Sequence, residues 1–198
     1  MCIRDSSIIS YPHPTLRFKS KPIKRVDQAL KDIAHQMVEL MYEADGVGLA
    51  ANQVNLPLRM FVVNDTGKRG EGEELILINP ELQLPRGGNH SMEEGCLSLP
   101  GVGGEVVRPK CITLSAYDIN GKPVEREVDG FLSRVLQHEN DHLDGIMFFD
   151  RMTDGARHDI EGQLNVLETD FKSKQKTGSI ESDEALVKGL NIWLEKYT

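Results

Sequence analysis

The chain has 198 residues, of which 39% are hydrophobic and 27% are charged, and its formal net charge at pH 7 is −8. These proportions are typical of one globular domain with a small appendage, and they exclude collagen-like, fibrous and wholly disordered chains. The longest apolar runs are a few residues long, too short to cross a bilayer. The acidic balance disfavours a broad nucleic-acid-binding face, which needs clustered Lys and Arg.

The three cysteines, Cys2, Cys96 and Cys111, are an odd number in a chain that is long enough to fold without disulfides. Free thiols indicate a reducing compartment, and the first residues lack the apolar segment of a secretion signal. We therefore expect a cytoplasmic protein. Residues 1–6 show no periodicity and are left out of the predicted fold.

The hydrophobic pattern predicts an amphipathic helix over residues 27–45, with Asp27 as its N-cap and Gly46 as its end. Strands are expected at residues 60–63, 75–78 and 111–117, because short apolar or alternating runs there are bounded by turn-forming residues. The dipeptide Asn120-Gly121 predicts a type I′ turn that joins the last of these to a further strand at residues 123–128.

A second helix is expected over residues 130–144, ended by Gly145. Beyond it, apolar residues from Ile160 to Phe171 form one helical stripe, residues 172–180 are a predicted polar linker, and residues 186–197 form a terminal amphipathic helix. We expect that terminal helix to pack on its own domain in preference to a partner. The predicted organisation is a catalytic domain at 7–152 and a helical extension at 153–198.

The second predicted helix contains the motif H-E-x-x-H, formed by His138, Glu139 and His142. Two histidines four residues apart share a helix face and can bind one metal ion. The glutamate then lies close enough to act on water at that ion, as in metal hydrolases. Apolar residues on both sides of the motif indicate a buried helix, which favours metal binding over an exposed pair of histidines.

A catalytic site of this kind needs a third protein ligand and one open position. Cys96 lies in an irregular segment at residues 94–101, where glycines and a proline can bring a side chain into a cleft. The alternative is an inert buried thiol, and spacing alone does not decide between the two. Cys111 and Cys2 are weaker candidates. The full set of candidates for the third ligand is His158, Glu161, Glu94 and Cys96.

The segment GVGLAANQ at residues 46–53 follows the first predicted helix. It matches the dinucleotide-binding pattern G-x-G-x-x-A, but a helix precedes it where that motif requires a strand. Its glycines permit close approach of backbone to a ligand, and Gln53 carries an amide that can donate to a developing oxyanion. An ordinary turn with a surface glutamine is the alternative, and this segment alone does not decide.

In this order, GVGLAANQ (46–53), EGCLS (94–98) and QHENDHLDG (137–145) resemble the three signature motifs of the peptide deformylase family. The segments at residues 14–17 and 78–80 add to the resemblance, which spans about residues 8–152 and leaves out the tail. We therefore expect an α+β fold in which antiparallel β-sheets pack around a central metal-binding helix, with an N-terminal helix and a C-terminal helical extension.

The resemblance implies that Cys96, His138 and His142 hold one divalent metal ion, with a fourth position open to water. It points to Fe²⁺ in the native enzyme, with Zn²⁺, Ni²⁺ or Co²⁺ also able to occupy the site. On ligand chemistry alone, one thiolate and two imidazoles suit zinc, and the affinity order of divalent metals cannot select iron.

The resemblance also implies the catalytic roles. Glu139 would take a proton from water and deliver it to the leaving amine, and Gln53 and the backbone N–H of Leu97 would bind the oxyanion. Gly48 would line the substrate channel. The family reaction removes the N-formyl group from the initiator formylmethionine of a nascent polypeptide and releases formate.

Phe131, Arg134 and Val135 precede His138 on its helix and lie on or beside the same face. We expect them to line the pocket for the methionine side chain, with Phe131 and Val135 against the thioether. Arg134 would extend to the rim and meet the peptide backbone. The alternative for Arg134 is that its side chain points to solvent.

Two other functions are weighed against deformylation. A zincin-type metallopeptidase would need a downstream third ligand and would leave EGCLS unexplained. A non-catalytic, metal-stabilised binding module would need neither Glu139 nor Gln53. The expected partners are N-formylmethionyl peptides. A ribosome contact is expected by analogy only, and neither a membrane nor bulk nucleic acid is expected.

Overall fold

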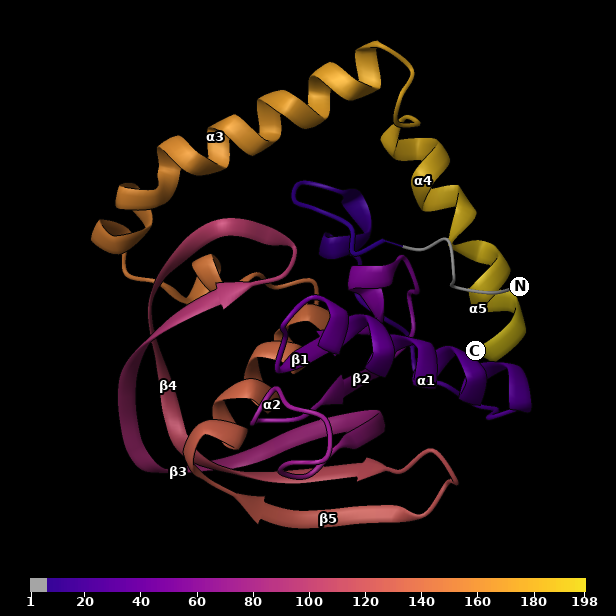
Figure 1. Cartoon of the computed structure of the whole chain (residues 1–198), viewed down its shortest axis with the longest axis vertical. Coiled ribbons are helices and arrows are strands. Elements are labelled where there is room, and N and C mark those ends of the chain that lie inside the picture. The colour runs from indigo at the N-terminus through magenta and orange to yellow at the C-terminus, as the bar shows by residue number, and fades with distance from the viewer. Residues whose placement is uncertain (1–6) are drawn as a thin grey trace.

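The computed structural model describes residues 7–198, and the prediction for residues 1–6 lies outside this range. The first two thirds of the chain contain all the strands of one sheet together with several helices, and only helices follow after residue 128 (Figure 1). The elements that carry the sheet and the site are η2 (Pro14–Arg17), α1 (Gln28–Glu43), β1 (Gly48–Ala50), η3 (Ala51–Val54), β2 (Met60–Val63), β3 (Leu75–Cys96), β4 (Leu99–Tyr117), β5 (Pro123–Val128) and α2 (Gly130–Leu143). The last elements are η4 (Phe148–Arg151), α3 (Asp154–Lys176), α4 (Asp183–Gly189) and α5 (Asn191–Tyr197).

The five strands form one antiparallel sheet in the order β1-β2-β3-β4-β5. The predicted α+β class is therefore confirmed, but the described strands make one sheet and not several. Register shifts interrupt the β3–β4 pairing between Gln83 and Asn89 and again at Gly95. Such irregularities bend strands, and the long strands β3 and β4 curve around α2 (Figure 1).

The two long strands extend far beyond the segments predicted at residues 75–78 and 111–117. Most of β3 after Pro80 is exposed on both faces, so its sequence has no alternation of apolar and polar residues. Pairing with β4 extends the strand where the pattern of side chains cannot indicate one. The end of β3 and the start of β4 nevertheless flank Leu97, which lines the cavity described below.

The predicted hairpin between β4 and β5 is confirmed, but the type I′ turn is wrong. That turn needs a positive φ at both central residues, and among the residues of the turn only Gly121 has one, at 79°. The carboxylate of Asp118 accepts hydrogen bonds from the N–H groups of Asn120 and Lys122, both at 2.8 Å. This side-chain cap stabilises a different turn from the one the dipeptide favours.

The two helices predicted around the site are confirmed within a residue or two at each end. Asp27 accepts a hydrogen bond from the N–H of Leu30 at 2.9 Å and caps α1, whose apolar face is fully buried. After α2, Gly145 takes a φ of 74°, and a Cβ there would lie 2.5 Å from the carbonyl oxygen of Arg17. Only glycine fits this helix end, which fixes where α2 stops.

The C-terminal region departs from the prediction in two places. Helix α3 continues to Lys176, so the linker predicted from residue 172 begins later; an ion pair between Lys174 and Asp170 at 2.7 Å supports that last turn. The single terminal helix is two helices, α4 and α5, which meet at the buried Leu190.

The predicted packing of the terminal helix on the rest of its own chain is confirmed, and helix α3 packs there as well. Ile160 and Leu164 of α3 belong to the same buried cluster as Leu99 and Phe148. At the other end, Tyr197 is 1% exposed and packs in the cluster formed by α1. Helices α3 to α5 therefore arch over the body and are anchored at both ends (Figure 1).

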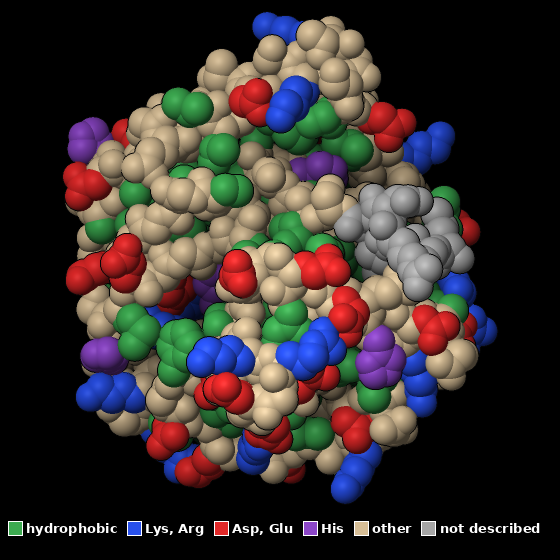
Figure 2. Space-filling view, in the orientation of Figure 1, with side chains coloured by type: hydrophobic (Ala, Val, Ile, Leu, Met, Phe, Trp, Pro, Cys, Tyr) green, Lys and Arg blue, Asp and Glu red, His purple; other side chains and the backbone are tan. Residues whose placement is uncertain are grey.

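Charges are mixed on the surface. On the face seen in Figure 2, Lys and Arg side chains are interspersed with Asp and Glu. Within residues 7–198, no helix combines the length and apolar character needed to cross a membrane.

Candidate metal centre

Three metal-binding side chains meet where the end of β3 lies against α2. Cys96 is the last residue of β3, and His138 and His142 lie one turn apart on α2. One donor atom from each lies within 4.8 Å of the others, and the Cys96 Sγ is 3.2 Å from His142 Nε2. Among residues 7–198, this is the group of His, Cys, Asp and Glu side chains found to be arranged for a metal ion.

The other candidates for a third ligand lie elsewhere or are occupied. His158 has a side chain that is 81% exposed and pairs with Glu161 on the outer surface of α3. Glu94 is buried, but its two oxygens accept hydrogen bonds from Arg108, Arg134 and His138. Cys96 is thus the candidate that the fold brings to both histidines.

Glu94 orients His138. The Nδ1 atom of His138 lies 3.0 Å from Glu94 Oε2, which leaves Nε2 for a ligand bond. Burial alone would raise the pKa of Glu94, but hydrogen bonds from His138 and Arg108 outweigh it and hold the pKa well below its ordinary value. Glu94 is therefore an anion at neutral pH.

The electrostatics around the two histidines favour a cation between them. Burial lowers the pKa of His138, but hydrogen bonds with Cys96 and Glu94 outweigh it and raise the pKa to about 10. The same two groups that attract a proton there attract a metal ion. Burial and the charges of His138 and Arg108 hold the pKa of His142 well below its ordinary value, so His142 stays neutral, the form in which imidazole binds metals.

The donor set fits a divalent transition metal. One thiolate and two imidazoles are ligands that zinc and iron accept, and three protein ligands leave one position open. The Nδ1 atom of His142 is buried without a hydrogen-bond partner, whereas the Nδ1 atom of His138 is held by Glu94. Cys96, His138 and His142 would hold the ion.

Glu139 lies beside this group, buried in the wall of the adjoining cavity. Glu139 is 4% exposed, and its Oε2 atom has no hydrogen-bond partner. Burial raises its pKa to about 7. Gly48 of β1 packs directly against it, since a Cβ at Gly48 would lie 2.4 Å from Glu139 Oε1. A buried carboxylate with a free oxygen is able to exchange protons with a molecule in the cavity.

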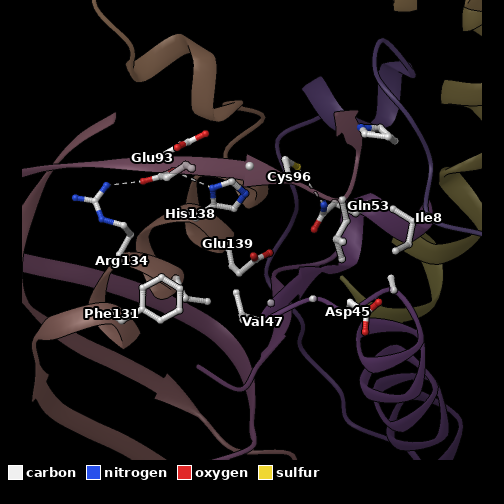
Figure 3. Close-up of a pocket in the computed structure, with 18 of the residues that line it drawn as sticks. Ile8, Asp45, Val47, Gln53, Glu93, Cys96, Phe131, Arg134, His138 and Glu139 are labelled. Carbon is white, nitrogen blue, oxygen red and sulfur yellow. Dashed lines mark hydrogen bonds and ion pairs between the residues drawn. The ribbon is translucent and has the colours of Figure 1, made fainter. Parts of the chain in front are cut away.

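Gln53 is fixed with its amide nitrogen toward Cys96. Its Oε1 atom accepts a hydrogen bond from the N–H of Ala50 at 2.8 Å. Its Nε2 atom then lies 3.5 Å from Cys96 Sγ and 3.2 Å from Ser98 Oγ. Figure 3 shows Gln53 and Cys96 next to each other, with Glu139 directed toward the same space. Leu97 follows Cys96 in the short connection between β3 and β4.

These groups open into a cavity of about 600 Å³. Phe131 is 46% exposed and Val135 is 4% exposed, and both lie on the α2 side of the cavity. Phe131 and Ile8 lie on opposite sides of it in Figure 3. The predicted site residues that line the cavity are Gly48, Gln53, Cys96, Leu97, Phe131, Arg134, Val135, His138 and Glu139. His142 is not among the lining residues and is buried, with 1% of its surface exposed.

Arg134 is buried and does not point to solvent, so that alternative is wrong. Its guanidinium donates to Glu94 Oε1 at 2.7 Å, to the carbonyl of Val106 at 3.0 Å and to the carbonyl of His90 at 2.6 Å. Arg134 lines the cavity (Figure 3). Its charge is paired with that of Glu94. The contact with a peptide backbone stays a prediction.

Sequence reasoning missed a buried network of charges behind the metal centre. Arg108 joins Glu94 at 2.7 Å to Asp141 at 2.7 Å, and Asp141 is also bound by Arg151. Asp141 lies inside the H-E-x-x-H motif, and Glu94 is the first residue of EGCLS. Their places within the motifs were the only features of the sequence that could have indicated a role for these two carboxylates. Pairing is what allows these charges to be buried.

The fold and site together have the features of a class of protein, the metal hydrolases: two histidines of one helix and a cysteine at a strand end could hold a metal ion beside a buried carboxylate. The sequence model of the polypeptide deformylase family matches residues 6–158, and the chain belongs to that family.

Two relatives extend the comparison. The chain is 54% identical to a peptide deformylase of Rhodopirellula baltica, over 97% of this chain and 95% of that protein. It is 41% identical to the chloroplastic and mitochondrial peptide deformylase 1B of Arabidopsis thaliana, over 90% of this chain and 65% of that protein. The first alignment includes nearly all of the C-terminal helices, which the sequence motifs did not cover.

Solved structures of peptide deformylases have the same fold as this chain. A plant peptide deformylase 1B superposes with a TM-score of 0.83 at 41% identity, covering 88% of this chain and 94% of that one. A peptide deformylase of Legionella pneumophila gives a TM-score of 0.75 at 36% identity, covering 86% of this chain and 97% of that one.

Proposed function

We propose that this chain removes the N-formyl group from the formylmethionyl end of nascent polypeptides and releases formate. Membership of the polypeptide deformylase family supports the reaction. The observation that carries the assignment to this site is the meeting of Cys96, His138 and His142 within 4.8 Å, beside the buried carboxylate of Glu139. Helix α2 is then the central metal-binding helix of the fold.

The metal is one divalent ion, Fe²⁺ in the native enzyme, with Zn²⁺, Ni²⁺ or Co²⁺ as alternatives. The donor set supports this range, and metal supply in the cell decides among ions that one site accepts. When bound, such an ion polarises the carbonyl of the substrate and lowers the pKa of water. The chain supplies the remaining catalytic groups.

Glu139 is the general base and then the general acid. Glu139 lines the cavity at the metal centre, and its Oε2 atom has no hydrogen-bond partner. There the carboxylate accepts a proton from the attacking water and later delivers that proton to the leaving amine. Gly48 holds the carboxylate in place by direct contact and lines the substrate channel.

Gln53 and Leu97 stabilise the negative charge that develops on the formyl oxygen. The hydrogen bond that Gln53 Oε1 accepts from the N–H of Ala50 directs the Gln53 amide nitrogen toward Cys96. Leu97, whose backbone N–H is the second donor, directly follows Cys96 in the chain. Two preorganised donors on one side of the reacting carbon form an oxyanion site.

Phe131 and Val135 receive the methionine side chain. Both are apolar, line the cavity and lie on the α2 face that carries His138, which suits a thioether. Arg134 contributes its aliphatic part to the wall and, through Glu94, stabilises the orientation of His138. The partners are N-formylmethionyl peptides. A ribosome contact rests on analogy alone.

We also propose that residues 7–152 form the catalytic part and residues 153–198 the helical extension, and that the protein works in the cytoplasm. The free thiols of Cys96 and Cys111 support a reducing compartment.

Formate release from formyl-Met-Ala-Ser, measured together with metal content after anaerobic purification, tests this function. We expect formate from the formylated peptide and no cleavage of its unformylated counterpart. Glu139→Gln should retain the metal and lose nearly all turnover. Cleavage of internal peptide bonds without formate release would instead establish the metallopeptidase alternative.

A further inference from the structure

The segment at residues 8–11, termed the N-terminal strap, is tied to both segments that carry the proposed oxyanion donors. The N–H of Ile9 donates to the carbonyl of Gln53 at 2.9 Å, and the N–H of Tyr11 donates to the carbonyl of Ser98 at 2.9 Å. Ile8 lines the active-site cavity. The strap therefore links η3 to the β3–β4 connection, two segments that lie more than forty residues apart in the sequence.

The side chain of Tyr11 ties the strap to the C-terminal helix α3. Its hydroxyl donates to Glu168 Oε1 at 2.7 Å, and its ring meets Phe149 edge to face at 5.3 Å. Burial, and next the hydrogen bond with Glu168, raise the pKa of Tyr11 to about 12, so the hydroxyl remains a donor at neutral pH.

Glu168 occupies a well-anchored part of α3. One turn before it, Leu164 is 5% exposed and packs in the core, and Leu167 packs against the same cluster. The second oxygen of Glu168 lies 3.9 Å from Lys172 Nζ. An acceptor on a packed helix fixes the hydroxyl of Tyr11 more firmly than one on a loop.

We propose that Tyr11 and Glu168 are positioning residues for deformylation, through which the C-terminal extension holds Gln53 and Leu97 in register. This inference rests on the proposed function. The path runs from Glu168 to the Tyr11 hydroxyl, and from the Tyr11 N–H to Ser98, whose Oγ lies 3.2 Å from Gln53 Nε2.

Loss of the tie should affect turnover more than binding. Oxyanion donors act on charge that exists only in the transition state, and their effect depends on placement within about 0.5 Å. A strap released from α3 lets the donors drift while the methionine pocket on α2 stays intact. We therefore expect kcat to fall and KM to stay unchanged.

The experiment compares Tyr11→Phe, Glu168→Ala and Glu168→Gln with the wild type in formate release, KM and metal content. Tyr11→Phe and Glu168→Ala should each lower kcat by about 3- to 10-fold with KM and metal content unchanged, which corresponds to about 0.6 to 1.4 kcal/mol. Glu168→Gln retains an acceptor oxygen and should restore most of the turnover.

Glu161→Ala is the matched control, because Glu161 lies two turns earlier on α3 and pairs only with the exposed His158 among the contacts described for it. It should match the wild type. Unchanged kcat in both Tyr11→Phe and Glu168→Ala, or an equal loss in Glu168→Gln, would overturn the inference. Absence of formate release by the wild type would instead refute the proposed function.

Discussion

At Gly48, a single added methyl group should lower the rate of catalysis and leave the fold intact. A Cβ at Gly48 would lie 2.4 Å from Glu139 Oε1 and 2.8 Å from Glu139 Cδ, whereas ordinary contacts begin at 3.4 Å. In Gly48→Ala, the carboxylate must therefore move by about 1 Å. Displacement of a catalytic group by this distance costs ~10²-fold in rate.

The fold should survive the same substitution. The atoms that the new Cβ meets belong to the end of a flexible side chain and not to backbone. Overpacking of this kind costs about 1 to 3 kcal/mol, less than the stability of an ordinary domain. The metal should be retained, because Cys96, His138 and His142 are not among the atoms displaced.

The assay measures kcat for formate release, metal content and the thermal midpoint of Gly48→Ala. Gly162→Ala on α3 is the control, since a Cβ there meets nothing within 4 Å, and its kcat should equal that of the wild type. A Gly48→Ala enzyme with wild-type kcat would show that the position of Glu139 does not limit the reaction, and the contact would lose its catalytic meaning.

Gln53→Ala should lower kcat by about 10²- to 10³-fold with metal content intact; an unchanged kcat would remove Gln53 from the oxyanion site. Glu94→Gln should weaken metal affinity by about 10- to 100-fold in a chelator competition, and equal affinity would contradict its orienting role. Phe131→Ala should reduce the preference for Met over Ala substrates, so a retained preference would disprove the pocket. Although burial raises the pKa of Asp150, its hydrogen bond with Arg17 lowers it on balance. Its stabilisation is therefore present above about pH 4 and lost as the pH falls further, and Asp150→Asn should show a smaller drop in thermal midpoint between pH 7 and pH 3 than the wild type.

The sequence by itself determined the local features of this protein. The cap at Asp27, the stop at Gly145 and the four-residue spacing of His138 and His142 each depend on residues within one or two turns of a helix. Such features follow from helical periodicity and backbone conformation alone. The family motifs then indicated Cys96 as the third ligand where spacing left four candidates.

Only the tertiary structure decided which distant groups meet. Cys96 reaches His142 because β3 runs far beyond its apolar start, through a stretch exposed on both faces that carries no periodic signal. Arg134 is buried because Glu94 lies opposite it, and Gly48 touches Glu139 because β1 packs on α2. Contacts between segments tens of residues apart depend on how whole elements pack, and a pattern within one element does not encode its neighbour.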